Sequence, residues 1–129
     1  MDIRELLTRR PIAHRGLHDG NVQCIENSLP AFEAAVAGDF AIELDVQLSA
    51  DNVAMVFHDE ALDRLTGESG PVSERTAPEL RALKLSGTQA WIPTLAETLA
   101  FVGGRVPVII EMKDNGDRNR QLALAVAGD

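Results

Sequence analysis

The sequence of 129 residues has few basic residues, one cysteine and no long apolar run. Its 12 basic residues are outnumbered by 20 acidic ones, and the formal net charge of −8 argues against a nucleic-acid or anionic-membrane surface. The lone Cys24 excludes an intramolecular disulfide and fits a reducing compartment. No apolar stretch approaches the length of a membrane span, and the charged N-terminus lacks the apolar core of a signal peptide. We therefore expect a cytoplasmic protein without stable membrane insertion.

Strand and helix patterns alternate along the chain, and 45% hydrophobic residues suffice for a core. Apolar runs predict strands over residues 12–14, 40–48 and 106–112, with a hairpin partner over 53–57. Capping signals and periodicity predict helices over 29–37, 76–83, 94–102 and 121–127. This order favours an α/β fold with a parallel sheet. One way to close such a sheet is a parallel barrel, which needs eight strands. Since the pattern shows only about three principal strands, we expect the chain to hold only about the first three strand–helix units of such a barrel.

Three carboxylates stand at positions that favour a shared site. Glu43 and Asp45 are two residues apart on one predicted strand, so their side chains point to the same face. Glu111 lies on a later strand, and the carboxyl ends of parallel strands meet at one edge of a sheet. Converging carboxylates repel one another, and a hard divalent cation such as Mg²⁺ or Ca²⁺ relieves this. Taken alone, Glu43 and Asp45 are equally well interpreted as exposed residues of an edge strand.

Two histidines and two cations follow apolar runs in the same way. His14 and His58 fall at strand ends, where one could take a proton from a nucleophile and the other give one to a leaving group. Arg15 and Lys113 could bind an anion. The alternative is that both simply form salt bridges with neighbouring acids. Together with a metal, these residues suit a phosphate ester.

Three further polar residues stand close to these positions. Glu26 and Asn27 precede a predicted helix and could support the site or form only a capping pair. Asp59 follows His58, and strand alternation predicts that it points the opposite way, where it could orient a neighbour.

An ordered series of motifs resembles the glycerophosphodiester phosphodiesterase family. Ser28 stands where the family usually has threonine, and Ile25 where it often has proline. No large insertion separates His58 from Glu111, as in the smaller bacterial members. The motifs, in order, are His14-Arg15-Gly16, Glu26-Asn27-Ser28, Ile42-Glu43-Leu44-Asp45-Val46, Val56-Phe57-His58-Asp59, Ile92-Pro93-Thr94-Leu95 and Glu111-Met112-Lys113.

The resemblance implies a TIM (β/α)8 barrel, with residues 1–10 as a lead-in and 11–129 as the N-terminal part of the barrel domain. It also implies metal-dependent hydrolysis of a small-molecule glycerophosphodiester to glycerol 3-phosphate and an alcohol. By position in the motifs, each residue takes a role. Glu43, Asp45 and Glu111 would hold Mg²⁺ or Ca²⁺, His14 and His58 would be the general acid and base, Arg15 and Lys113 would bind phosphate, and Glu26 and Asn27 would support them.

Two other functions remain open at this point. One is a related phospholipase-type phosphodiesterase that acts on an intact lipid, although the chain shows no apolar patch or basic rim for a membrane. The other is a truncated, non-catalytic fragment that binds phosphate. Because an open part of a barrel leaves sheet edges unpaired, we also expect the isolated chain to be poorly stable or to self-associate through an exposed edge.

Overall fold

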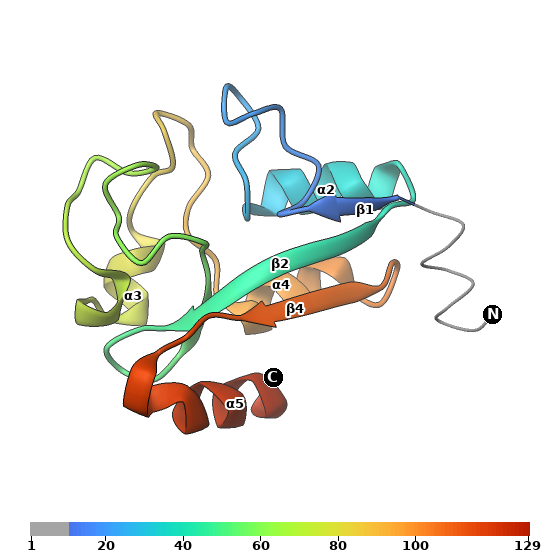
Figure 1. Ribbon diagram of the computed structural model, residues 1–129. Helices are drawn as coiled ribbons and strands as arrows, with labels where there is room; N and C mark the ends of the chain where they lie inside the picture. The colour runs from blue at the N-terminus through green and yellow to red at the C-terminus, as the bar shows by residue number, and fades with distance from the viewer. Residues whose placement is uncertain (1–10) are drawn as a thin grey trace.

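The computed structural model describes residues 11–129, and the lead-in predicted over residues 1–10 lies outside them. Strands and helices alternate in the order expected (Figure 1). The strands are β1 (Ile12–His14), β2 (Ala41–Leu48), β3 (Ala54–Val56) and β4 (Val108–Met112). The helices are α2 (Leu29–Ala37), α3 (Ala77–Arg81), α4 (Leu95–Val102) and α5 (Asn119–Gly128), with 3-10 turns η1 (Val72–Glu74) and η2 (Gly116–Arg118).

Strand β2 is the centre of the described sheet. It runs parallel to β1 and β4 and antiparallel to β3. Ile42 pairs with both β1 and β4, and Val46 pairs with both β3 and β4, so β1 and β3 share the edge of β2 opposite β4. The parallel sheet and the antiparallel hairpin partner are therefore confirmed. The apolar run before His58 is antiparallel to the others, so it does not end at a parallel carboxyl edge.

The helices begin where capping chemistry predicted. The Ser28 hydroxyl accepts a hydrogen bond from the Ala31 N–H at the start of α2. Thr76 and Thr94 each form a complete capping box at the start of α3 and α4. β4 starts at Val108 rather than at residue 106, because Pro107 has no N–H to donate to a strand ladder. α3 ends at Arg81, two residues earlier than predicted.

The two faces of β2 have different chemistry. Ile42, Leu44, Val46 and Leu48 are fully buried in an apolar cluster that includes residues of α2, α4 and α5. Figure 1 shows α2 and α4 behind the sheet and α5 below it. Strand alternation places Glu43, Asp45 and Gln47 on the other face. The helices therefore bury one face, and the polar residues lie on the face that those helices leave free.

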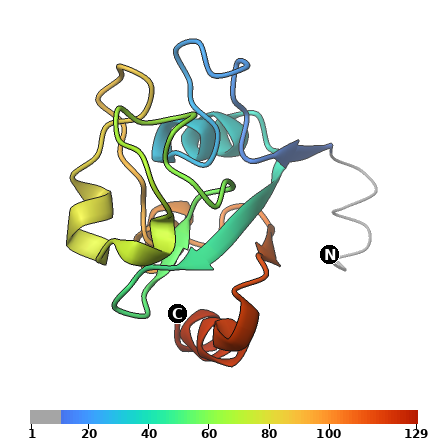
Figure 2. The same ribbon diagram turned by 60° about the vertical axis from the view of Figure 1, so that its left-hand side comes forward.

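A second apolar cluster anchors the loops between β3 and α4. Met55 and Phe57 join Leu62, Leu65 and other residues of this long segment in the cluster. Because Met55 pairs with Gln47, its side chain lies on the polar face of β2. Figure 2 shows these loops at the same end of the molecule as the loop of residues 17–25. The segment after β3 is thereby held beside the polar residues.

Candidate active site

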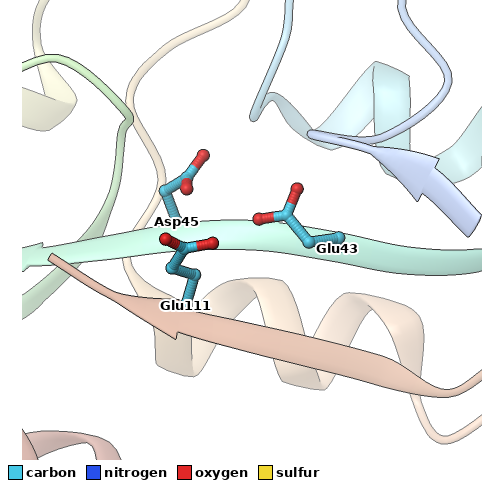
Figure 3. A group of neighbouring side chains, drawn as sticks. All are labelled: Glu43, Asp45 and Glu111. Atoms are coloured by element: carbon cyan, nitrogen blue, oxygen red, sulfur yellow. The ribbon is translucent and has the colours of Figure 1, made fainter.

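The three carboxylates predicted to share a site converge on one face of the sheet. Glu43 and Asp45 project from β2, and Glu111 on β4 pairs in register with Asp45 (Figure 3). One carboxylate oxygen from each residue lies within 4.8 Å of the others. Because β2 is paired along both edges and Asp45 is only 2% exposed, the edge-strand interpretation is wrong. The three residues form an acidic cluster able to hold a metal ion.

The environment of Glu43 fits a cation rather than a hydrogen-bonded carboxylate. Both of its carboxylate oxygens are buried and have no hydrogen-bond partner. Burial raises the pKa of Glu43, and the negative charges of Asp45 and Glu111 raise it further, while His14 opposes them. Oxygen atoms converging in this way are the ligands that Mg²⁺ and Ca²⁺ prefer.

Two cations and an amide surround the carboxylate of Asp45. Arg15 Nε lies 3.6 Å from Asp45 Oδ2, and Lys113 Nζ lies 3.6 Å from Asp45 Oδ1. The Asn27 side chain donates a hydrogen bond of 3.1 Å to Oδ2. The salt bridges expected as an alternative role for Arg15 and Lys113 are therefore present. Both cations also stand beside the acidic cluster, where they can contact an anion that a metal ion brings there.

An abrupt turn directly after β1 directs Arg15 to the site. Arg15 and Gly16 both have a positive φ, of 61° and 80°, in the left-handed region that non-glycine residues rarely adopt. The Arg15 N–H donates to the Glu43 carbonyl at 2.7 Å, and the Arg15 carbonyl accepts from the Asn27 N–H at 2.8 Å. These bonds to β2 and to the loop just before α2 hold a backbone conformation that would otherwise be unfavourable.

The two histidines lie in different environments. His14 is 67% exposed, and its Nε2 is 3.3 Å from Glu43 Oε2. His58 is 30% exposed, and its Nδ1 is 2.8 Å from Asp59 Oδ1. His58 and Lys113 line a groove of about 480 Å³ on the polar face. The prediction that Asp59 points away from His58 is wrong, because β3 ends at Val56 and strand alternation no longer applies beyond it.

Glu26 and Asn27 are not the cap of α2, since Ser28 takes that place. Glu26 is 3% exposed and accepts a 3.0 Å hydrogen bond from Arg15 and one of 2.8 Å from Asn21. Burial raises its pKa, but hydrogen bonds from Arg64 and Asn21 outweigh this and hold the pKa below its usual value. The capping alternative is wrong, and both residues contact the predicted site residues.

Sequence patterns missed one residue, Arg64. It lies in the irregular segment after β3, and its guanidinium donates hydrogen bonds to both Asp59 and Glu26. The pair with Glu26 joins positions 38 residues apart. Neither periodicity nor local spacing signals such a contact, because it depends on how the loops fold back over the sheet.

None of the helices in residues 11–129 is long and apolar enough to cross a membrane.

Comparison with known proteins gives a consistent result. Residues 14–124 match the sequence model of the glycerophosphoryl diester phosphodiesterase family. A glycerophosphodiester phosphodiesterase of Caldanaerobacter subterraneus subsp. tengcongensis is 40% identical over 103 residues, which cover 73% of this chain and 40% of that protein. A lysophospholipase D of Rattus norvegicus is 35% identical over 122 residues, which cover 84% of this chain and 37% of that protein.

A solved structure shows the same fold. An Oleispira antarctica phosphodiesterase in complex with its product sn-glycerol-3-phosphate superposes with a TM-score of 0.81 at 29% identity. The match covers 92% of this chain and 50% of that one. The α/β architecture is therefore part of a TIM barrel, as expected. The chain spans less than half the length of the curated relatives it matches.

Proposed function

Because the chain belongs to the glycerophosphoryl diester phosphodiesterase family, we propose that the protein hydrolyses a glycerophosphodiester to glycerol 3-phosphate and an alcohol. One observation carries this proposal. Glu43, Asp45 and Glu111 converge on the same sheet face as Arg15 and Lys113. An acidic cluster that could hold a metal ion, flanked by two cations, suits a phosphodiester, whose two free oxygens share one negative charge.

The metal would be held by the three carboxylates, as Mg²⁺ or Ca²⁺. Glu43 offers two buried oxygens without hydrogen bonds, and Asp45 and Glu111 each offer one within 4.8 Å. When bound, a divalent cation supplies stabilisation of negative charge on the phosphate and the reacting oxygen. In this proposal Arg15 and Lys113 hold the phosphate beside it, as a planar fork and a point charge.

Proton transfer would fall to His14 and His58. In this proposal one takes the proton of the attacking hydroxyl or water, and the other gives a proton to the alcohol that leaves. Family kinship also suggests that the hydroxyl next to the phosphate in the glycerol moiety attacks first, which gives a cyclic phosphate. His58 is the better fixed of the two, because Asp59 holds its Nδ1 and leaves Nε2 for the reaction.

The test measures release of glycerol 3-phosphate from glycerophosphocholine by the protein at its natural length. We expect His14→Ala and His58→Ala each to lower kcat by about 10²–10⁴-fold. His18→Ala is the matched control, since His18 lies in a loop, where its Nδ1 accepts a hydrogen bond from the Gly20 N–H. A chelator should abolish activity, and Mg²⁺ or Ca²⁺ should restore it. Normal turnover by either catalytic variant would refute the assignment.

A substrate with a better leaving group assigns the two histidines. A glycerophosphodiester of p-nitrophenol needs little help from an acid, because its alcohol departs as a stable anion. The variant that lacks the general acid should therefore recover most of its activity on this substrate, and the variant that lacks the base should not. Equal losses for both variants on both substrates would contradict separate roles.

A second candidate substrate is an intact lysophospholipid, which the similarity to a lysophospholipase D favours. The loop after β1 carries two exposed apolar side chains, Leu17 at 43% and Val22 at 73%. Asn21 joins this loop to Glu26 beside the site. If the lipid is the substrate, Val22→Asp should lower turnover of lysophosphatidylcholine and spare that of glycerophosphocholine.

We further propose a cytoplasmic location, based on the single cysteine, which cell fractionation would test.

A further inference from the structure

The guanidinium of Arg64 lies between two carboxylates that contact different parts of the site. Its Nε and Nη2 donate to Asp59 at 2.8 and 3.1 Å. Its Nη1 and Nη2 donate to Glu26, both at 3.0 Å. Four of the five N–H donors of an arginine are thereby used, in two bidentate pairs.

Each of these two carboxylates also contacts a second residue of the site. Asp59 contacts His58 Nδ1 at 2.8 Å, and hydrogen bonds from Arg64 lower the pKa of Asp59 to about 2. Asp59 is therefore ionised, so it favours the His58 tautomer that carries its proton on Nδ1. Glu26 accepts a hydrogen bond from Arg15, whose guanidinium also faces Asp45.

We propose that Arg64 is a positioning residue that fixes the His58–Asp59 pair and the Arg15–Glu26 pair relative to each other. This inference rests on the proposed function, in which His58 transfers a proton and Arg15 binds phosphate. The two groups must reach one phosphorus centre from different elements, His58 from beyond β3 and Arg15 from beyond β1. Arg64 connects them through its hydrogen bonds to Asp59, which contacts His58, and to Glu26, which contacts Arg15.

The backbone around Arg64 is suited to this role. Leu62 and Leu65 flank it and are buried in the second apolar cluster, at 0% and 3% exposure. This packing fixes where the side chain starts, while its guanidinium reaches the polar site. A lysine at this position would keep the charge, but its single ammonium cannot hold four carboxylate oxygens in one plane.

The test compares Arg64→Lys with Arg81→Lys in the protein at its natural length. Arg81 is a matched control, because it also forms a bidentate pair, with Glu97, and has the same 45% side-chain exposure away from the site. We expect Arg64→Lys to lower kcat by about tenfold or more and to raise KM, and Arg81→Lys to change neither. In the Asp59→Asn background, Arg64→Lys should lower kcat less than in the wild type, because the part of its effect that passes through His58 is already lost and only the part through Glu26 and Arg15 remains.

The tautomer of His58 gives a readout that needs no substrate. ¹⁵N NMR of the labelled protein should show His58 protonated at Nδ1 in the wild type and in Arg81→Lys, and a tautomer mixture in Arg64→Lys. An unchanged tautomer with unchanged kcat in Arg64→Lys overturns the proposal, as does an equal loss of kcat in Arg81→Lys. If the wild type releases no glycerol 3-phosphate, the proposed function fails, whereas the NMR comparison still decides whether Arg64 positions His58.

Discussion

Glu43→Gln is expected to stabilise the metal-free protein and to weaken its stabilisation by a divalent cation. Glu43 lies within 4.8 Å of Asp45 and Glu111, with both of its oxygens buried and without hydrogen bonds. At an effective dielectric constant of about 20, two like charges at that separation repel by about 3 kcal/mol. Arg15 and Lys113, each 3.6 Å from Asp45, offset much of that repulsion. We therefore expect the variant to gain about 1–2 kcal/mol in the free energy of unfolding.

The pH dependence of stability follows from the same carboxyl. Burial and neighbouring charge raise the pKa of Glu43 in the folded protein above its ordinary value of 4.5. The stability that the protonated Glu43 carboxyl contributes to the folded protein is fully present below 4.5. It is lost as the pH rises through the folded pKa. In a chelator, the wild type should therefore lose stability over this range, and Glu43→Gln should lose less.

Thermal melts with and without cation check both parts of this prediction. A cation at a hundredfold excess over its Kd should stabilise the wild type by about 2.7 kcal/mol, and Glu43→Gln by much less. Glu33→Gln is the control, because it removes the same charge from an exposed site on α2. A variant that melts below the wild type in chelator, or that keeps the full response to Mg²⁺ and Ca²⁺, would refute the reasoning.

Three further predictions concern stability and association. Asp59→Asn should lower the free energy of unfolding by about 1–2 kcal/mol at neutral pH. Urea titrations should show this difference between variant and wild type shrink as the pH falls toward 2, since the pKa of Asp59 in the folded protein is about 2. Gly16→Ala should lower the urea midpoint, because Gly16 has a φ of 80° and a Cβ there would lie 2.8 Å from the Ala31 Cβ; an unchanged midpoint would contradict this. The 129-residue chain alone should self-associate, because β4 pairs only with β2 in the described sheet, and a concentration-independent monomer in sedimentation would count against it.

The acidic cluster could be predicted because it depends on short-range regularities. The spacing of Glu43 and Asp45 fixes a common face once β2 is a strand, and Glu111 joins them because the strands are parallel. The helix starts followed from local capping chemistry at Ser28, Thr76 and Thr94. In each of these cases the relevant interaction is set within a few residues or by a ladder of backbone hydrogen bonds.

The predictions that failed concern residues outside regular elements. Strand alternation predicts that the side chains of Asp59 and His58 point in opposite directions. Both residues follow the end of β3, where the backbone is no longer an extended strand and the alternation does not apply. Arg64 gave no signal, because its partner Glu26 lies 38 residues away across two loops. The positive φ of Arg15 could not be predicted from the sequence either. It depends on hydrogen bonds to Glu43 and Asn27 that only the folded chain provides.

Strand β2 separates the stability of the fold from the chemistry of the site. Leu44 is fully buried against the helices, so its contribution to folding does not depend on the charges around Asp45, its neighbour in sequence. The repulsion within the acidic cluster can persist because the other face of the same strand supplies apolar burial. The cations and amides around Asp45 and Glu26 then reduce the remaining electrostatic penalty without occupying the oxygens of Glu43. Glu43 is thus the carboxylate whose unmet hydrogen-bonding capacity a metal ion can satisfy, which is why its substitution separates binding from folding most sharply.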